Sequence, residues 1–285
     1  METRHRPFFA LFITPAVLSA VVFAASMIAV LQFSMREQIP GSLSVGGLTL
    51  DNFTAMLHPI YGRVFLDTLW ICALTAVISL ILGYPLAYAL VHTCNLVLKS
   101  AILIITVTPL FLGEVVRTYS WIVVLGSNGF INLLLLKLKL IAEPLQILFT
   151  LTGVVIALVH VTLPVVTVML AAAIAHIDVD YEKAAASLGA GPVRVFLTVT
   201  LPLSGPGIVA SLSTAFAWTF SAFATPQLVG GGRVNMISNL VYQLGFSNFN
   251  FPFAASLSVA GLALTFTSLA LLRIALRPLE RIGSS

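Results

Sequence analysis

Six long apolar segments run along the chain, and short stretches between them hold most of the charged residues. Each segment has about 20 or more mostly apolar residues, the length that a helix needs to cross a bilayer. They are Phe8–Phe33, Val64–Val91, Ser100–Leu125, Ile147–Ile177, Pro206–Val229 and Pro252–Leu276. The apolar runs are continuous rather than alternating, which indicates helices and not barrel strands. We expect an all-α integral membrane protein with six transmembrane helices, forming one domain over residues 1–285.

Composition agrees with a bilayer environment. Hydrophobic residues make up 59% of the 285 residues and charged residues only 8%, whereas a soluble domain has about 25% charged residues. The net charge of +4 is spread thinly, so no basic tract is dense enough to bind nucleic acid. The first apolar run is too long for a signal peptide and lacks a clear cleavage site, so we expect it to be a membrane helix in contact with lipid.

Lysine and arginine predict the orientation, because cytoplasmic loops carry more of both. An even number of spans places both termini on one side, and that side has the larger basic group. The larger group is Arg4, Arg6, Lys99, Lys183, Arg194, Arg273, Arg277 and Arg281, and the smaller is Arg36, Arg63, Lys137, Lys139 and Arg233. We expect both termini in the cytoplasm. The external stretch Gly129–Leu140 is too short to span and suggests an interfacial helix.

The internal loop before the fifth span predicts two short helices. Asp178 or Asp180 can cap the first helix, and Gly189 or Gly191 can end it. Pro192 suits the first turn of the second helix. One face of the first helix collects Tyr181, Ala184, Ala185 and Leu188. Periodicity alone also fits an ordinary amphipathic connector, so the residue identities must decide.

Those identities resemble the EAA motif of ATP-binding-cassette (ABC) importer permeases. The motif is Glu-Ala-Ala, three residues, Gly, nine residues, then an aliphatic residue, any residue and Leu-Pro. Six positions match at the family spacing: Ala184, Ala185, Gly189, Val199, Leu201 and Pro202. Lys183 stands where the family usually has Glu, and Glu182 lies one residue earlier. The salt-bridging role of the family's Glu is therefore absent here or has moved to Glu182.

The resemblance extends over nearly the whole chain, from about residue 8 to residue 276. The matching stretches are Phe12–Pro15, Arg117–Trp121, Asn128–Asn132, Thr225–Gly231 and Asn239–Gln243. They are similar to the spermidine/putrescine-like permeases, and Phe12–Pro15 is similar to the first of the two permease types in that group. The resemblance implies the type I ABC importer permease fold in a bacterial inner membrane. It also implies inward transport of a polyamine-like or related small polar solute by alternating access.

The resemblance also implies partners: a second permease in a heterodimer, two cytosolic ATPases and a periplasmic substrate-binding protein. The loop of about residues 178–202 would be the coupling helix that contacts an ATPase, with Glu182, Lys183 and the six matched positions as its site residues. The chain has no G-x-x-x-x-G-K-[ST] phosphate loop. ATP and Mg²⁺ are therefore expected on the partner ATPase, and this chain is expected to be a non-catalytic subunit without a cofactor.

Candidate pathway residues gather in the fifth span. Its polar and aromatic mixture is Trp218, Ser221, Ala222, Phe223, Thr225 and Gln227. Pathway lining and helix packing explain this mixture about equally well. Pro226 should leave a carbonyl near Ala222 without its helical donor, free to meet a solute. Four prolines are expected to interrupt membrane helices: Pro85, Pro109, Pro164 and Pro226.

Glu114 and Arg117 are the charged candidates of the third span. They are spaced i, i+3 and can pair with each other, or they can supply a polar lining or a contact between subunits. Intramembrane charge is costly and is often functional.

Two other classes of protein fit less well. A secondary transporter without an ATPase would need midplane carboxylates and inverted repeats, and neither is evident. A membrane enzyme would need a catalytic cluster at one depth, but the histidines are scattered. Cys72 and Cys94 lack a CxxC spacing, so no metal site is expected. The sequence does not identify the solute.

Overall fold

The computed structural model describes the backbone of residues 6–42 and 44–283, and side chains within 13–42 and 44–278. Backbone contacts divide the chain into two compact units. The first unit is Met1–Gly62 with Leu240–Ala263, and the second is Arg63–Asn239 with Leu264–Ser285. The basic residues Arg4, Arg6 and Arg281, and Phe12 of the N-terminal resemblance, lie outside the described side chains.

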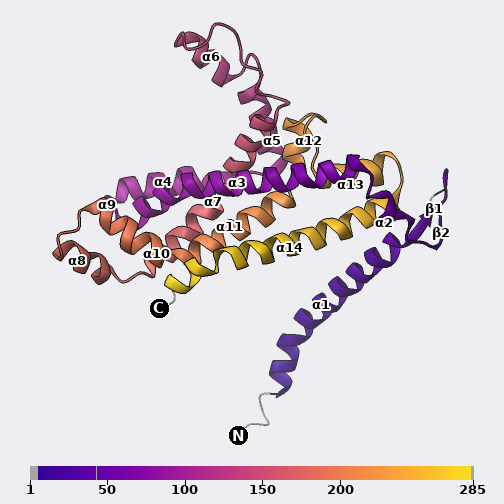
Figure 1. Ribbon diagram of the computed structural model, residues 1–285, viewed down its shortest axis with the longest axis horizontal. Coiled ribbons are helices and arrows are strands. Elements are labelled where there is room, and N and C mark those ends of the chain that lie inside the picture. The colour runs from indigo at the N-terminus through magenta and orange to yellow at the C-terminus, as the bar shows by residue number, and fades with distance from the viewer. Residues whose placement is uncertain (1–5, 43, 284–285) are drawn as a thin grey trace. The chain divides into compact units, whose positions relative to one another are not determined.

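Helices dominate both units (Figure 1). The first unit contains α1 (Arg6–Ser34), β1 (Arg36–Gln38), β2 (Val45–Leu48), α2 (Asp51–Ala55) and the π-helical turn η3 (Gln243–Ser247). The second contains α4 (Leu96–Phe111), α5 (Glu114–Leu125), α6 (Phe130–Lys137), α7 (Leu151–Ala175), α8 (Val179–Ser187), α9 (Pro192–Val195), the π-helical turn η2 (Phe196–Thr200), α10 (Leu201–Leu203), α11 (Gly205–Phe220) and α12 (Ala224–Val229). Three helices cross the boundary: α3 (Pro59–His92), α13 (Ile237–Tyr242) and α14 (Phe251–Gly283).

The expected membrane helices are present as apolar helices. Five stretches are long and apolar enough to cross a bilayer: Ile13–Ser34, Pro59–His92, Glu114–Lys137, Leu151–Ala175 and Phe251–Pro278. The pair Pro192–Leu203 and Gly205–Phe220, bent by 67°, supplies a sixth if it is one span. The number of spans expected from the sequence therefore agrees with the described part of the chain.

The third expected span, Ser100–Leu125, is divided. Helix α4 ends at Phe111 and α5 begins at Glu114, because Leu112 and Gly113 have extended backbone torsions. The apolar stretch that begins at Glu114 runs on through α6 to Lys137. The stretch Gly129–Leu140 is helical over Phe130–Lys137, as expected, and an interfacial position for it stays a prediction.

Prolines interrupt fewer helices than the sequence suggested. Helix α3 continues through Pro85 and α7 continues through Pro164, so the expectation of breaks at these two positions is wrong. Both helices bury many residues around the proline, and packing by neighbouring helices tolerates the lost hydrogen bond. Pro109 lies in the last turn of α4, next to a real break. Pro226 lies inside the short helix α12.

The core of the second unit lies where α3, α7 and α11 pack together. Ser79 of α3 hydrogen bonds Thr162 of α7 over 2.6 Å between the hydroxyl oxygens. At Gly207 of α11, an added Cβ would lie 2.1 Å from the Cβ of Ala173, so only glycine permits this approach of α11 to α7. The apolar core includes Ile71, Cys72, Val154, Leu158, Val166, Leu170, Ile208 and Phe216.

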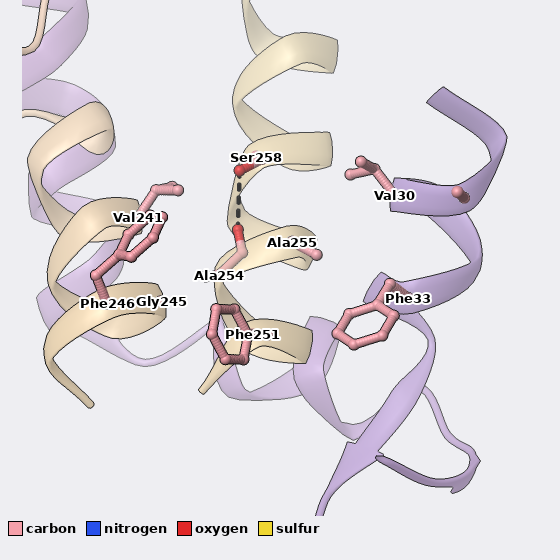
Figure 2. A pocket seen from close by; sticks show the side chains of 10 residues that line it. Val30, Phe33, Val241, Gly245, Phe246, Phe251, Ala254, Ala255 and Ser258 are labelled. Atoms are coloured by element: carbon pink, nitrogen blue, oxygen red, sulfur yellow. Dashed lines mark hydrogen bonds between the residues drawn. The ribbon is translucent and has the colours of Figure 1, made fainter. Parts of the chain in front are cut away.

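The first unit is held by a few polar contacts at a small antiparallel hairpin of β1 and β2. The Asn52 side chain donates to the carbonyls of Ser34 and Arg36, and Gln38 donates to the Phe249 carbonyl over 3.0 Å. An open apolar groove of about 440 Å³ lies between α1, α13, η3 and α14 (Figure 2). Phe33, Phe246 and Phe251 line it together with small residues such as Ala254.

Candidate functional site

Helix α8 of the internal loop is defined by caps at both ends. The Asp178 carboxylate accepts a hydrogen bond from the Asp180 N–H over 2.9 Å, which selects Asp178 from the two expected N-caps. At the other end the Gly189 N–H donates to the Ala186 carbonyl and the Ala190 N–H donates to the Ala185 carbonyl. This pattern is a Schellman motif, which needs a left-handed residue at its first position after the helix. Gly189 has φ +86° and satisfies that need.

The second part of the loop is a helix with irregular hydrogen bonding. Pro192 begins α9, as expected, and the chain then forms the π-helical turn η2. The Leu201 N–H donates to the Phe196 carbonyl five residues earlier, and Pro202 has no N–H to restore the α-helical pattern. The chain then bends by 67° at Ser204 before α11. The Tyr84 and Ser204 hydroxyls hydrogen bond over 2.6 Å at this bend.

The two faces of α8 differ sharply in exposure. Tyr181, Ala184 and Leu188 are exposed, and the Leu188 side chain is 90% exposed. Glu182 and Ala185 are half-buried against the rest of the second unit. The expected stripe is therefore divided, because Ala185 lies on the inner face while its other three members lie on the outer face.

The Leu-Pro end of the motif does not lie on that outer surface. Val199, Leu201 and Pro202 are half-buried, and Leu201 packs against the core of the second unit. Their structural role in this chain is to join the loop to α11.

The two charged residues at the start of the motif point in opposite directions. The Glu182 carboxylate lies 3.0 Å from Nε2 of His92 at the end of α3, and it accepts a hydrogen bond from the Thr200 hydroxyl of η2. Lys183 is largely exposed and binds the Asp180 carboxylate over 2.9 Å. The Lys183 ammonium holds the pKa of Asp180 below its ordinary value by this hydrogen bond.

The fifth expected span breaks where the pathway candidates lie. Helix α11 ends at Phe220 and α12 begins at Ala224. The Ser238 hydroxyl donates to the Ala222 carbonyl over 2.7 Å, so the expectation that this carbonyl is free is wrong. The Asn239 amide donates to the Phe223 carbonyl and to Oε1 of Gln227, over 3.3 and 2.8 Å. Side chains of α13 thus satisfy acceptors at the α11–α12 break.

The pathway candidates separate by exposure. Trp218, Ser221 and Gln227 are exposed on the surface of the chain, and Ala222 and Phe223 are half-buried. Thr225 is only 2% exposed, and its hydroxyl lies 3.4 Å from that of Thr118 on α5. In this conformation only the first three present large or polar side chains to a solute or a partner.

Glu114 and Arg117 do not pair with each other. Arg117 is 8% exposed and donates to the Pro109 carbonyl over 2.7 Å, whereas Glu114 is exposed. Among the described residues, the ion pairs are His92–Glu182 and Lys183–Asp180. Arg117 therefore satisfies a carbonyl at the α4–α5 break, and the pairing left open by the sequence is absent.

Several residues of these polar contacts carried no signal in the sequence. His92 and Thr200 meet Glu182 although they are 90 and 18 positions away from it. Asn239 begins the stretch Asn239–Gln243 that carries a family resemblance and Ser238 precedes it, but nothing in the pattern links them to Ala222 or Phe223. No group of three His, Cys, Asp or Glu side chains that could hold a metal ion occurs in the described part of the chain.

Taken together, the apolar helices and the helix break satisfied by side chains define an integral membrane protein, with the small helix α8 exposed on its second unit. The chain belongs to the family of binding-protein-dependent transport system inner membrane components, whose family model matches residues 78–281. It is thus a permease subunit of an ABC importer, a non-catalytic component of an inner-membrane transporter. This membership excludes the secondary transporter and the membrane enzyme considered from the sequence.

Two relatives illustrate the similarity. The spermidine/putrescine transport system permease protein PotB of Escherichia coli is 32% identical over 212 residues, which cover 74% of this chain and 76% of that protein. The inner membrane ABC transporter permease protein YdcU of Escherichia coli is 28% identical over 297 aligned positions, which cover 98% of this chain and 92% of that protein.

Solved structures show the same fold. The bacterial alginate ABC transporter in complex with an alginate pentasaccharide-bound periplasmic protein matches with a TM-score of 0.81 at 17% identity, over 99% of this chain and 96% of that chain. The inward-facing MetNI methionine ABC transporter matches with a TM-score of 0.57 at 16% identity, over 80% of this chain and 98% of that chain. The type I ABC importer permease fold expected from the EAA-like loop is confirmed.

Proposed function

We propose that this permease moves a polyamine-like organic cation inward by alternating access. The single observation that carries the choice of solute is the 32% identity to PotB over three quarters of the chain. The exposed side chains at the α11–α12 break are compatible with such a solute. Gln227 and Ser221 offer oxygen acceptors, and the Trp218 indole can attract a cation by about 0.5–2 kcal/mol. No carboxylate lies between Trp218 and Gln227, so binding there should be weak.

The assembly we propose has four kinds of subunit. This chain pairs with a second, similar permease, and two cytosolic ATPases bind ATP and Mg²⁺. A periplasmic protein delivers the solute. We propose the orientation that the basic residues predict, with both termini in the cytoplasm. A fluorescent protein fused to the C-terminus tests this orientation, because it should fold and fluoresce if that terminus is cytoplasmic.

The exposed face of α8 is the proposed contact with an ATPase. Tyr181, Ala184 and Leu188 form a small, mainly apolar surface that the rest of the second unit leaves uncovered. The alanine allows close approach of a partner's backbone. Such a surface can transmit closure of the ATPases to the membrane helices. It belongs to a capped helix that contacts α3 through Glu182 and His92.

Purification and reconstitution test the proposal. The chain is coexpressed with the permease, ATPase and binding-protein genes that neighbour its own gene. The mass and subunit composition of the purified complex are then measured by native mass spectrometry. Spermidine or putrescine uptake into proteoliposomes is then followed with and without ATP. ATP-dependent uptake supports the proposed solute. ATP-dependent uptake of molybdate or an amino acid, without polyamine uptake, would overturn it, and two copies of this chain without a second permease would overturn the heterodimer.

A further inference from the structure

The Glu182 carboxylate joins three elements of the second unit. It lies on α8, it contacts Nε2 of His92 at 3.0 and 3.3 Å, and it accepts the Thr200 hydroxyl hydrogen bond from η2. The Glu182 side chain is 17% exposed and the His92 side chain 31% exposed. We call this group, Glu182 with His92 and Thr200, the Glu182 clamp.

His92 is held so that both ring nitrogens face acceptors. Its Nδ1 lies 3.0 Å from the Tyr88 carbonyl, which can only accept, so Nδ1 carries a hydrogen. Its Nε2 lies 3.0 Å from the Glu182 carboxylate, within hydrogen-bond distance. The ring also stacks on Tyr88 with 4.0 Å between centroids. The histidine therefore presents a fixed, directional partner to the carboxylate.

The partners of Glu182 belong to one packed platform. Tyr84 and Tyr88 of α3 both meet the Phe196 ring of η2 edge to face, with centroids 5.5 and 5.4 Å apart. Thr200 is fully buried. Helix α8, in contrast, has no buried residue. Its attachment to the platform therefore depends more on the polar bonds of Glu182 than on apolar packing.

We propose that Glu182 is a positioning residue that fastens the ATPase-facing helix α8 to α3 and η2. A force on the outer face of α8 then reaches the membrane helices without α8 rotating or detaching. The proposal rests on the proposed coupling role of α8. It also explains the departure from the family motif. A helix turns by about 100° per residue, so the shift from position 183 to position 182 directs the carboxylate inward and leaves Lys183 outside.

The primary test measures solute transported per ATP hydrolysed in proteoliposomes. Glu182→Ala removes both bonds and should lower this ratio about tenfold, while the ATPase still copurifies. Glu182→Gln can accept from Thr200 and donate to a neutral His92, so it should restore most of the ratio. The double variant Glu182→Ala/His92→Ala should be no worse than Glu182→Ala alone.

Thr198 and Thr200 give a matched control. Both are threonines of η2, but the Thr198 hydroxyl is exposed and donates to the Arg194 carbonyl in its own helix. Thr200→Ala should lower the transport ratio, whereas Thr200→Ser should keep it and Thr198→Ala should leave it unchanged. Equal effects of the two alanine variants would overturn the proposal.

A second readout needs neither transport nor an ATPase. Ala185→Cys places a reporter on the inner face of α8, in a background where the exposed Cys94 is serine. A water-soluble thiol reagent should modify it slowly, and several times faster when Glu182→Ala is added. Unchanged labelling would overturn the clamp even if the importer works. Faster labelling in a chain that copurifies no ATPase would support the clamp and overturn the proposed function instead.

Discussion

Helix α8 and the α11–α12 break are both interruptions of the helical framework, and they are held in different ways. Helix α8 has no buried residue and is tied to the rest of the second unit mainly by the polar bonds of Glu182. At the break, Ala224, Thr225 and Pro226 are buried and α13 supplies two side chains to nearby acceptors.

Helix α8 and the break should therefore differ in how easily they move. Regions with little buried apolar surface open at low free-energy cost, and packed regions open only with their neighbours. Helix α8 can therefore adapt to a partner, whereas the break can change only if α13 moves with it.

The largest effect is expected from a charge on the inner face of α8. Ala185→Glu places a second carboxylate one turn from Glu182, and like charges in a half-buried site repel. We expect transport to fall about tenfold or more with membrane insertion unchanged, measured as uptake at equal protein level. Ser187→Glu is the comparison on the exposed face that we propose meets the ATPase: a loss of transport there should come with loss of ATPase copurification, whereas Ala185→Glu should lose transport with the ATPase still bound. Loss of copurification in both variants would show that the two faces of α8 do not differ.

A smaller effect is expected at the packed break. Asn239→Ala removes the two hydrogen bonds that its side chain donates, to the Phe223 carbonyl and to Oε1 of Gln227, each worth about 0.5–1.5 kcal/mol. We expect a lower thermal unfolding temperature in detergent and reduced uptake. Asn248→Ala, an exposed position, is the control. If Asn239→Ala unfolds at the wild-type temperature, the break is not held by this side chain.

Ser238→Ala should have a milder effect than Asn239→Ala. It removes one neutral hydrogen bond to the Ala222 carbonyl, worth about 0.5–1.5 kcal/mol. The same thermal unfolding measurement compares the two variants. A larger drop in unfolding temperature for Ser238→Ala than for Asn239→Ala would contradict this order. The hydrogen bond from Ser238 to the Ala222 carbonyl would then be the main contact that stabilises the break.

The smallest perturbation uses single cysteines to map exposure at the break. With Cys94 replaced by serine, cysteine at Ser221 should react with a water-soluble thiol reagent, and cysteine at Thr225 should stay protected in this conformation. Labelling of the assembled importer with and without ATP then shows whether the cysteine at position 225 becomes exposed during the transport cycle. Protection of Ser221 in every state would exclude it from the pathway.

Local patterns in the sequence were sufficient for most of the membrane helices, but not for the breaks that divide the third expected span at Leu112 and Gly113 and the fifth between Phe220 and Ala224. The apolar runs place the membrane helices, because about 20 apolar residues satisfy both the bilayer and their own backbone. Caps act within a few residues, so the sequence narrowed the N-cap of α8 to Asp178 or Asp180 and its end to Gly189 or Gly191, and it placed Pro192 at the start of the next helix. The structure selected Asp178 and Gly189. The EAA-like spacing identifies the family on the same local scale.

Contacts between distant residues were decided only by the tertiary structure. No local sequence pattern indicates that Glu182 contacts His92 or that Ser238 donates to the Ala222 carbonyl. Nor does one indicate that Arg117 binds the Pro109 carbonyl rather than Glu114. The course of α3 through Pro85 and of α7 through Pro164 depended on neighbouring helices. Periodicity and caps are properties of one segment, whereas the partner of a buried polar group depends on which segments pack together, and that is set by the fold as a whole.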